Sequence, residues 1–181
     1  MQTIKQLWNG FRLLPSAWLL LVQLALLILA TITYDDSAYR ALTWSLGVLA
    51  LLIIAKVIRQ TPVFAFWGLF FVSGAFIFSI LIFVGFDNHT IQITAYSFEA
   101  LAYFYAAYGL LRYMFSDRYL TKDELFAAGA VFTLIAWAFA FLYSICQIIL
   151  PNSFQNPNHP EALQRWLDLL FLSFSLQSAT G

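Results

Sequence analysis

Long apolar stretches and short polar connectors alternate along the chain. The apolar stretches cover residues 17–33, 41–58, 63–85, 91–115 and 125–150. A helix rising about 1.5 Å per residue needs roughly 20 apolar residues to cross the hydrocarbon core of a bilayer, and these stretches are close to or above that length. Gln23 is the only strongly polar residue in the first of them. The pattern therefore predicts an all-α membrane protein with five transmembrane helices.

Signals for the start and the end of a helix lie in the connectors. Thr61 and Pro62 supply an N-cap and a first-turn proline for the third stretch. Thr121 and Glu124 have the spacing of a capping box ahead of the fifth stretch. Pro151 follows that stretch directly, so we expect the fifth helix to end there.

The N-terminal segment has a different pattern. Its apolar side chains recur at helical spacing, with Lys5 and Arg12 off that face, and they are Ile4, Leu7, Trp8 and Phe11. This pattern predicts a short amphipathic helix over residues 1–15 that lies in the membrane interface and is broken by Pro15. The alternative is a disordered tail in which the pattern arises by chance.

The last segment, residues 160–181, begins as an amphipathic helix and ends in small polar residues. Pro160 suits a first helical turn, with Asn158 or His159 as the cap. One helical face carries Leu163, Trp166, Leu167, Leu170, Phe171 and Phe174. The uninterrupted apolar part, residues 169–176, is too short to cross a bilayer. The pattern therefore predicts a re-entrant helix that enters the membrane and stops partway.

Small residues follow this helix, and they are Ser178, Ala179, Thr180 and Gly181. The unpaired carbonyl groups at a helix C-terminus carry about half a negative charge, so a cation is the species favoured just beyond them. Glycine allows the backbone to turn so that consecutive carbonyl groups face one way. The end of the chain is therefore the place where we expect function to lie.

Residues 173–181, SFSLQSATG, resemble the pore helix and the first half of the selectivity filter of potassium channels. The pattern of that family is roughly S-F-x-T-x-T-T-V-G-(Y or F)-G-D, and Phe174, Ser178 and Gly181 fit it best. Ala179 stands where the family has its second threonine, and Thr180 where it has valine. Because that threonine adds a hydroxyl group to the innermost ion site, the resemblance implies a weaker preference for K⁺ over Na⁺ in this chain.

The resemblance implies a homotetrameric pore-loop cation channel, in which carbonyl oxygens from four filters replace the hydration shell of the ion. It assigns the ion-conducting filter to Ser178, Ala179, Thr180 and Gly181, with transient K⁺ at Thr180 and Gly181. It assigns the support of the pore helix to Trp166, Asp168 and Phe174. The second half of the filter and a sixth helix would follow Gly181 in that family, so we expect the chain to be truncated inside the filter.

Composition agrees with a membrane protein. Hydrophobic residues make up 62% of the 181 residues and charged residues 10%, whereas a soluble domain has about 25% charged residues. The net charge is zero and no block of basic residues is present, so we expect the lipid bilayer, and not nucleic acid, as the partner. Cys146 is the only cysteine, which excludes an intrachain disulfide.

The sequence contains none of the common catalytic motifs. His89 and His159 are isolated, without a second ligand at the spacing of a metal site. No G-x-S-x-G or H-E-x-x-H motif occurs. We therefore expect neither an enzyme nor a bound cofactor nor a small-molecule substrate.

Basic residues predict the orientation in the membrane. Seven of the nine lysines and arginines fall on one side of the predicted spans, and they are Lys5, Arg12, Lys56, Arg59, Arg112, Arg118 and Lys122. Arg40 and Arg165 fall on the other side. The positive-inside rule then predicts a multi-pass protein of the plasma (cell inner) membrane with a cytoplasmic N-terminus. Five spans place the start of the re-entrant helix outside, as a potassium-channel pore loop requires.

Glu99 is the one acid in the middle of the fourth stretch. Small residues share its helical face, and they are Ala95, Ala102, Ala106 and Gly109. Tyr96 and Tyr103 lie three and four residues away, within reach to donate hydrogen bonds to the carboxyl group. An acid in a span predicts a pH-dependent gate or a contact between helices, and a packing residue is the alternative. Arg112 is the only basic residue of this stretch, so no strong voltage sensor is expected.

Three regions follow from these patterns. Residues 1–15 form the interfacial helix, residues 16–116 a four-helix transmembrane region, and residues 117–181 a partial pore domain with outer helix, pore helix and the start of the filter. The alternative is a small polytopic membrane protein of another class, a transporter subunit or a membrane enzyme, whose C-terminal helix lies on the surface.

Overall fold

The computed structural model describes residues 15–32, 62–86, 88–115, 122–151, 153–154 and 164–180. Within these ranges all regular structure is helical, and the helices are α2 (Pro15–Ile32), α4 (Pro62–Val84), α5 (His89–Met114), α6 (Lys122–Ile149) and α7 (Trp166–Ser178). The all-α prediction is confirmed for this part of the chain. Several predictions concern residues outside the described ranges. These are the interfacial helix, the stretch over residues 41–58, Thr121, Pro160 and Gly181.

Four of the predicted spans correspond to helices. The stretches over residues 17–33, 63–85, 91–115 and 125–150 become α2, α4, α5 and α6, each shifted by three residues or fewer at its ends. Pro15, which we expected to end an N-terminal helix, is instead the first residue of α2. A proline fits that position because the first N–H groups of a helix have no partner within the helix.

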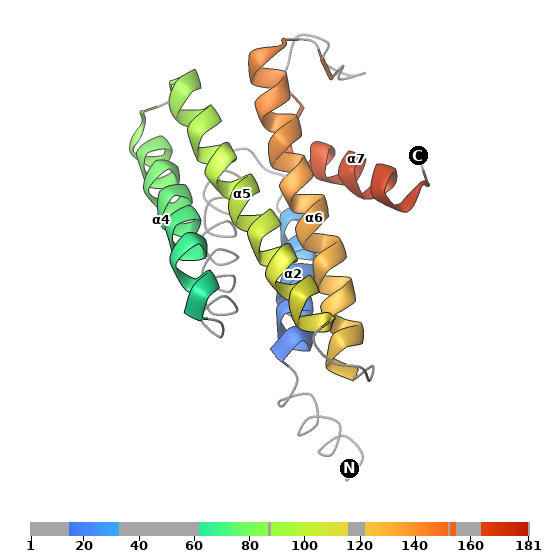
Figure 1. Ribbon diagram of the computed structural model, residues 1–181. Helices are drawn as coiled ribbons and strands as arrows, with labels where there is room; N and C mark the ends of the chain where they lie inside the picture. The colour runs from blue at the N-terminus through green and yellow to red at the C-terminus, as the bar shows by residue number, and fades with distance from the viewer. Residues whose placement is uncertain are drawn as a thin grey trace.

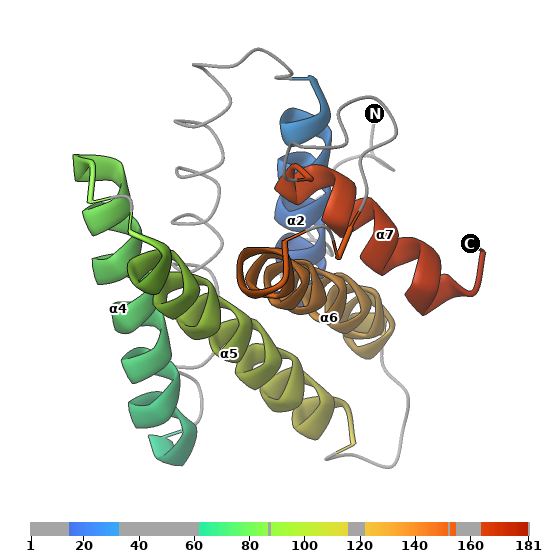
Figure 2. The same ribbon diagram turned by 90° about the horizontal axis from the view of Figure 1, so that it is seen from above.

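The helices α4, α5 and α6 run alternately up and down (Figure 1). α4 and α6 run in one direction and α5 in the other, with α5 packed between them. α2 packs against α6 on the side away from α5, as the view from above also shows (Figure 2). The short helix α7 contacts α6 and crosses it instead of following it. The arrangement is a small bundle with one transverse helix attached.

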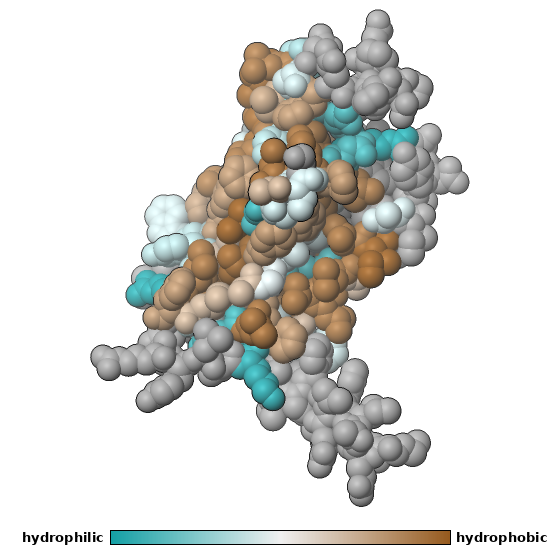
Figure 3. Space-filling model, turned by 90° about the vertical axis from the view of Figure 1, so that its right-hand side faces the viewer, coloured by the Kyte–Doolittle hydropathy of each residue, from teal (hydrophilic) through white to brown (hydrophobic). Residues whose placement is uncertain are grey.

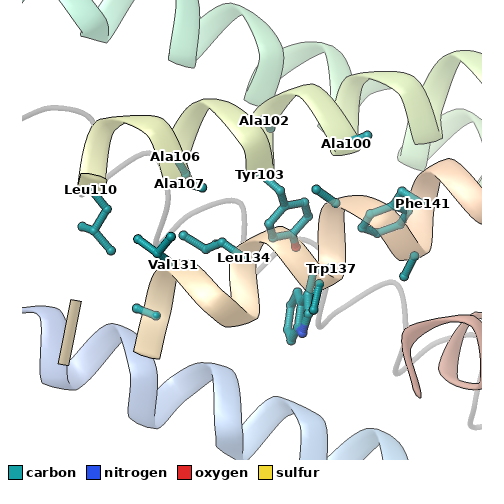
Figure 4. Close-up of a cluster of buried hydrophobic side chains, with 14 of the residues drawn as sticks. Ala100, Ala102, Tyr103, Ala106, Ala107, Leu110, Val131, Leu134, Trp137 and Phe141 are labelled. Carbon is teal, nitrogen blue, oxygen red and sulfur yellow. The ribbon is translucent and has the colours of Figure 1, made fainter. Parts of the chain in front are cut away.

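The core of the bundle lies mainly between α5 and α6. Small side chains of α5 allow close approach of its neighbours, and they are Ala100, Ala102, Ala106 and Ala107. Figure 4 shows Ala106 and Ala107 on the side of α5 that faces α6. The Tyr103 ring stacks on Phe141 at 5.6 Å and meets Trp137 edge-on at 5.6 Å. Ala95 and Ala102 of the predicted small-residue face are fully buried. The alanines of that face thus allow close helix packing, as predicted, whereas a Cβ added at Gly109, the last member of the face, would have no atom within 4 Å.

One helix in the described part of the chain, α6, is long and apolar enough to cross a membrane, and 56% of its apolar stretch is buried inside the molecule. Two apolar helical segments, Ser16–Ile28 and Phe66–Ile82, fall below that length. Hydrophobic residues also cover much of one outer face (Figure 3). A buried core helix of a soluble protein meets the same criterion as α6, so length and composition identify one candidate span among the described helices, not five.

Candidate functional site

The C-terminal end of α7 carries the predicted filter residues. Ser178 is the last residue of the helix, and Ala179 caps it in the left-handed region at φ 55°. The N–H of Ala179 donates to the carbonyl oxygen of Leu176 at 3.3 Å, and that of Thr180 to Ser175 at 3.1 Å. A left-handed residue with a Cβ costs about 1–2 kcal/mol, so these hydrogen bonds hold a strained turn.

Hydroxyl groups gather at this turn. Ser178 Oγ lies 2.8 Å from Thr180 Oγ1 and donates to the carbonyl oxygen of Phe174 at 2.7 Å. Ser178, Ala179 and Thr180 are all exposed. The turn thus offers neutral oxygen atoms beside the negative end of a helix dipole, the kind of ligand that hard cations accept.

Aromatic contacts attach α7 to the middle of α6. At its start, the Trp166 ring lies 5.7 Å from Trp137 and 5.5 Å from Phe141. Near its end, the Phe174 ring lies 5.8 Å from Phe132. Trp166 is therefore at the opposite end of α7 from the predicted filter residues, and Phe174 lies one turn before them.

The buried face of α7 differs from the predicted one. Leu169, Leu170 and Ser173 are almost fully buried, whereas the Phe171 side chain is 74% exposed. Phe171 belongs to the predicted apolar face by its spacing, but α6 covers only one side of α7 and leaves Phe171 outside that contact. Asp168 is exposed in the first turn of α7, where an acid favours the positive end of the helix dipole.

The predicted start of the re-entrant helix is also wrong. Gln164 and Arg165 are not helical, and Arg165 has extended φ and ψ angles of −69° and 150°. Gln147 of α6 explains this, because its side-chain amide binds the backbone of Gln164. Its Nε2 donates to the Gln164 carbonyl oxygen at 3.1 Å, and the Gln164 N–H donates to its Oε1 at 3.0 Å. The N–H and C=O groups of Gln164 thus bond to the Gln147 side chain and not within a helix, and α7 begins at Trp166.

Glu99 forms a contact between α5 and α4. Its side chain is 8% exposed, and Ser79 Oγ donates to its Oε1 at 2.9 Å. The hydroxyl group of Tyr103 has no hydrogen-bond partner among the described residues, so the prediction that Tyr103 donates to Glu99 is wrong. The hydrogen bond joins Glu99 to the neighbouring helix α4, and its donor is a serine that the sequence pattern did not indicate.

Two other buried polar contacts between helices were not predicted from the sequence. Asp123 in the first turn of α6 accepts from the N–H of Ser16 at 3.1 Å and from its hydroxyl group at 2.8 Å, and so caps α2. Thr133 Oγ1 donates to Gln23 Oε1 at 2.6 Å. Polar residues inside apolar stretches, such as Gln23 and Gln147, indicate that hydrogen bonds between helices exist. Helical periodicity does not identify the residues with which they pair.

Comparisons of the chain with protein-family models, with curated proteins and with solved structures find no match. The function proposed below therefore depends on the residues and their arrangement.

Proposed function

We propose that this chain belongs to a subunit of a potassium-channel-like cation channel that conducts monovalent cations passively and has no strong voltage sensor. The observation that carries the proposal is the short helix α7, which lies across α6 and ends in exposed Ser178, Ala179 and Thr180. At about 1.5 Å per residue its 13 residues extend about 20 Å, less than the roughly 30 Å of a hydrocarbon core. A helix of that length suits a pore helix that stops within the membrane.

The long helices support the proposal that the chain crosses the membrane several times. α4 has 23 residues without a charged side chain, and α6 has 28 residues with its acids confined to the first turn. Their alternating directions place the α4–α5 turn and the end of α6 at the same end of the bundle (Figure 1). With the distribution of basic residues, this arrangement favours a plasma-membrane protein whose N-terminus is cytoplasmic and whose α7 starts from the outer side.

Oligomeric state follows from the same proposal. One filter strand supplies carbonyl groups from one direction only, and a permeant ion stripped of water needs them from all sides. We therefore propose a homotetramer with K⁺, and Na⁺ to a lesser degree, as the permeant ions. The rival is a polytopic protein of another class with α7 on its surface.

Reversal potentials test this function. The native polypeptide that contains residues 1–181 is reconstituted into liposomes, and currents are recorded with K⁺ on one side and Na⁺ on the other. We expect a cation current with a weak preference for K⁺, because Ala179 offers no hydroxyl oxygen. Ala179→Thr should strengthen the preference, and Ser153→Thr, away from α7, should not.

Two results would count against the proposal. Strong K⁺ selectivity in the unmodified protein contradicts the role given to Ala179. Absence of any cation current from well-folded, membrane-inserted assemblies contradicts the channel itself and favours the rival.

A further inference from the structure

The backbone just before α7 is held by one side chain of α6. Gln147, in the last turn of α6, is 7% exposed, and its amide forms a pair of hydrogen bonds with the peptide groups of Gln164 at 3.1 Å and 3.0 Å. One bond uses the amide as a donor and the other uses it as an acceptor. A two-point contact of this kind fixes both the position and the direction of the bound backbone, as a residue pair does in a β-ladder.

The other contacts between α6 and α7 are less directional. Among the described residues they include ring contacts at Trp166 and Phe174 and buried apolar side chains such as Leu170. Apolar packing resists separation of two helices, but it tolerates small rotations and shifts better than a pair of hydrogen bonds does. Gln147 is therefore the contact best suited to set the angle at which α7 leaves α6.

Because α7 is long, a small change in that angle causes a larger displacement at the far end of the helix. Trp166 and Ser178 are the first and last residues of the helix, so they lie about 18 Å apart along it, and a tilt of about 5° at the start displaces the far end by about 1.6 Å. A displacement of that size is several times larger than the roughly 0.3–0.5 Å difference in metal–oxygen distance between Ca²⁺ and Mg²⁺ sites, so even a smaller tilt would alter the coordination of an ion.

We infer that Gln147 is a positioning residue for the ion-coordinating segment at Ser178–Thr180, acting through the backbone of Gln164 and the rigid helix α7. The inference rests on the proposed channel function and adds a residue, remote from the filter, that sets its ion preference.

Three variants of the native polypeptide test the inference. Gln147→Met has a side chain of similar length without the amide. Gln147→Glu keeps the shape, and its introduced carboxyl group, when protonated, again offers one donor and one acceptor to Gln164. Ser144→Ala is the matched control, because Ser144 is also buried in α6 but donates within its own helix, to the Ala140 carbonyl oxygen at 3.0 Å.

Two measurements are made on each variant in liposomes. The first is hydrogen exchange of the Gln164 amide, which we expect to become about tenfold faster in Gln147→Met because a net hydrogen bond is lost. The second is the K⁺/Na⁺ permeability ratio, which we expect to change in Gln147→Met and to stay at the wild-type value in Ser144→Ala. In Gln147→Glu the permeability ratio should approach wild type as the pH is lowered and depart from it as the pH is raised, because the ionised carboxylate has no donor for the Gln164 carbonyl oxygen although it still accepts from the Gln164 N–H.

The outcomes separate this inference from the proposed function. Unchanged exchange in Gln147→Met shows that the hydrogen-bond pair does not hold the backbone, and it overturns the inference whatever the currents are. Faster exchange with an unchanged permeability ratio reduces Gln147 to a structural residue and also overturns it. A wild-type protein without cation current removes the channel function, while the exchange data still decide whether Gln147 holds Gln164. If Gln147→Met does not fold, the pH dependence of the permeability ratio in Gln147→Glu decides the inference.

Discussion

At the scale of single residues, buried polar groups determine which substitutions the protein tolerates. Glu99 accepts a hydrogen bond from Ser79 on the neighbouring helix, so its carboxyl group is part of the α4–α5 contact. A buried donor that loses its acceptor costs more free energy than the bond itself contributes, because the donor stays unsatisfied. By the same reasoning, a buried hydroxyl group without a hydrogen-bond partner lowers the free energy of unfolding.

Glu99→Gln should leave the fold intact, because the amide oxygen still accepts from Ser79. Glu99→Ala should lower the free energy of unfolding by about 2 kcal/mol, since it leaves Ser79 unsatisfied and opens a cavity. Thermal unfolding in detergent compares the two. If Glu99 also tunes gating, Glu99→Gln should flatten the pH dependence of the current in liposomes, because the amide does not titrate. An unchanged pH dependence restricts Glu99 to the helix contact.

Tyr103→Phe should leave the free energy of unfolding unchanged or raise it by about 1 kcal/mol. The Tyr103 side chain is 1% exposed, and its hydroxyl group has no hydrogen-bond partner within the described residues, so the substitution removes an unsatisfied group and keeps the ring contacts. Tyr113→Phe is the control, because Tyr113 donates to Asp123 at 3.2 Å and should lose about 1 kcal/mol. Equal losses in both variants would contradict the assignment.

At the scale of elements, two glycines have opposite surroundings. A Cβ added to Gly74 of α4 would lie 2.4 Å from Cδ1 of Phe98, whereas one added to Gly109 of α5 would have no atom within 4 Å. Phe98 has little room to move away, since its ring also lies 5.7 Å from Phe70 and 5.6 Å from Phe78. Gly74 therefore allows α4 and α5 to approach, and Gly109 has no such role.

Gly74→Ala should lower the free energy of unfolding by about 1–3 kcal/mol through overpacking. Gly109→Ala should raise it by up to about 1 kcal/mol, because alanine is the better helix former and meets no neighbour. Thermal unfolding of both variants in the same detergent measures the difference. Recovery of stability in the double variant Gly74→Ala/Phe98→Leu would tie the loss to the ring, and a loss of the same size in Gly109→Ala would contradict the packing argument.

The helices could be predicted from the sequence more reliably than the contacts between them. Apolar length and the prolines located α2, α4, α5 and α6, because these signals are local. The start of α7 could not be predicted, since it depends on Gln147, which is 17 residues away from Gln164 and reaches it only in the folded chain. The exposure of Phe171 likewise depends on which side of α7 faces α6. The small residues at the end of the chain indicated where the candidate site lies. They did not predict the left-handed conformation of Ala179.

At the scale of the whole molecule, buried and partly buried hydrogen bonds join elements that pack against one another. Ser16 and Asp123 join α2 to α6, Ser79 and Glu99 join α4 to α5, and Gln147 joins α6 to the backbone before α7. In the proposed membrane setting lipid tails are as apolar as leucine, so helix association depends on packing and on such polar contacts. Each contributes about 0.6 kcal/mol on average in membrane proteins, and together they specify which helices are neighbours.

The alternating directions of the helices give a prediction for the whole bundle. Residue 88 directly precedes α5, residue 153 follows α6, and residue 122 is the first residue of α6. The start of α5 and the end of α6 lie at one end of the described structure, and the start of α6 lies at the other (Figure 1). Single cysteines are introduced as Asn88→Cys, Ser153→Cys and Lys122→Cys in a Cys146→Ser background, which removes the only native thiol. We expect a membrane-impermeant maleimide applied to intact cells to modify positions 88 and 153 but not position 122, because most basic residues fall on the side of position 122.

Permeabilised cells provide the control, since all three cysteines should then react if each is accessible to solvent. Modification of position 122 with protection of 88 and 153 would reverse the orientation and place the start of α7 on the cytoplasmic side, which a potassium-channel-like pore helix does not permit. Modification of all three positions in intact cells would show that the bundle does not separate two compartments. Protection of 88 together with modification of 153 would mean that the two ends lie on different sides of the membrane, and the alternating arrangement of α4, α5 and α6 would then be wrong for the protein in its bilayer.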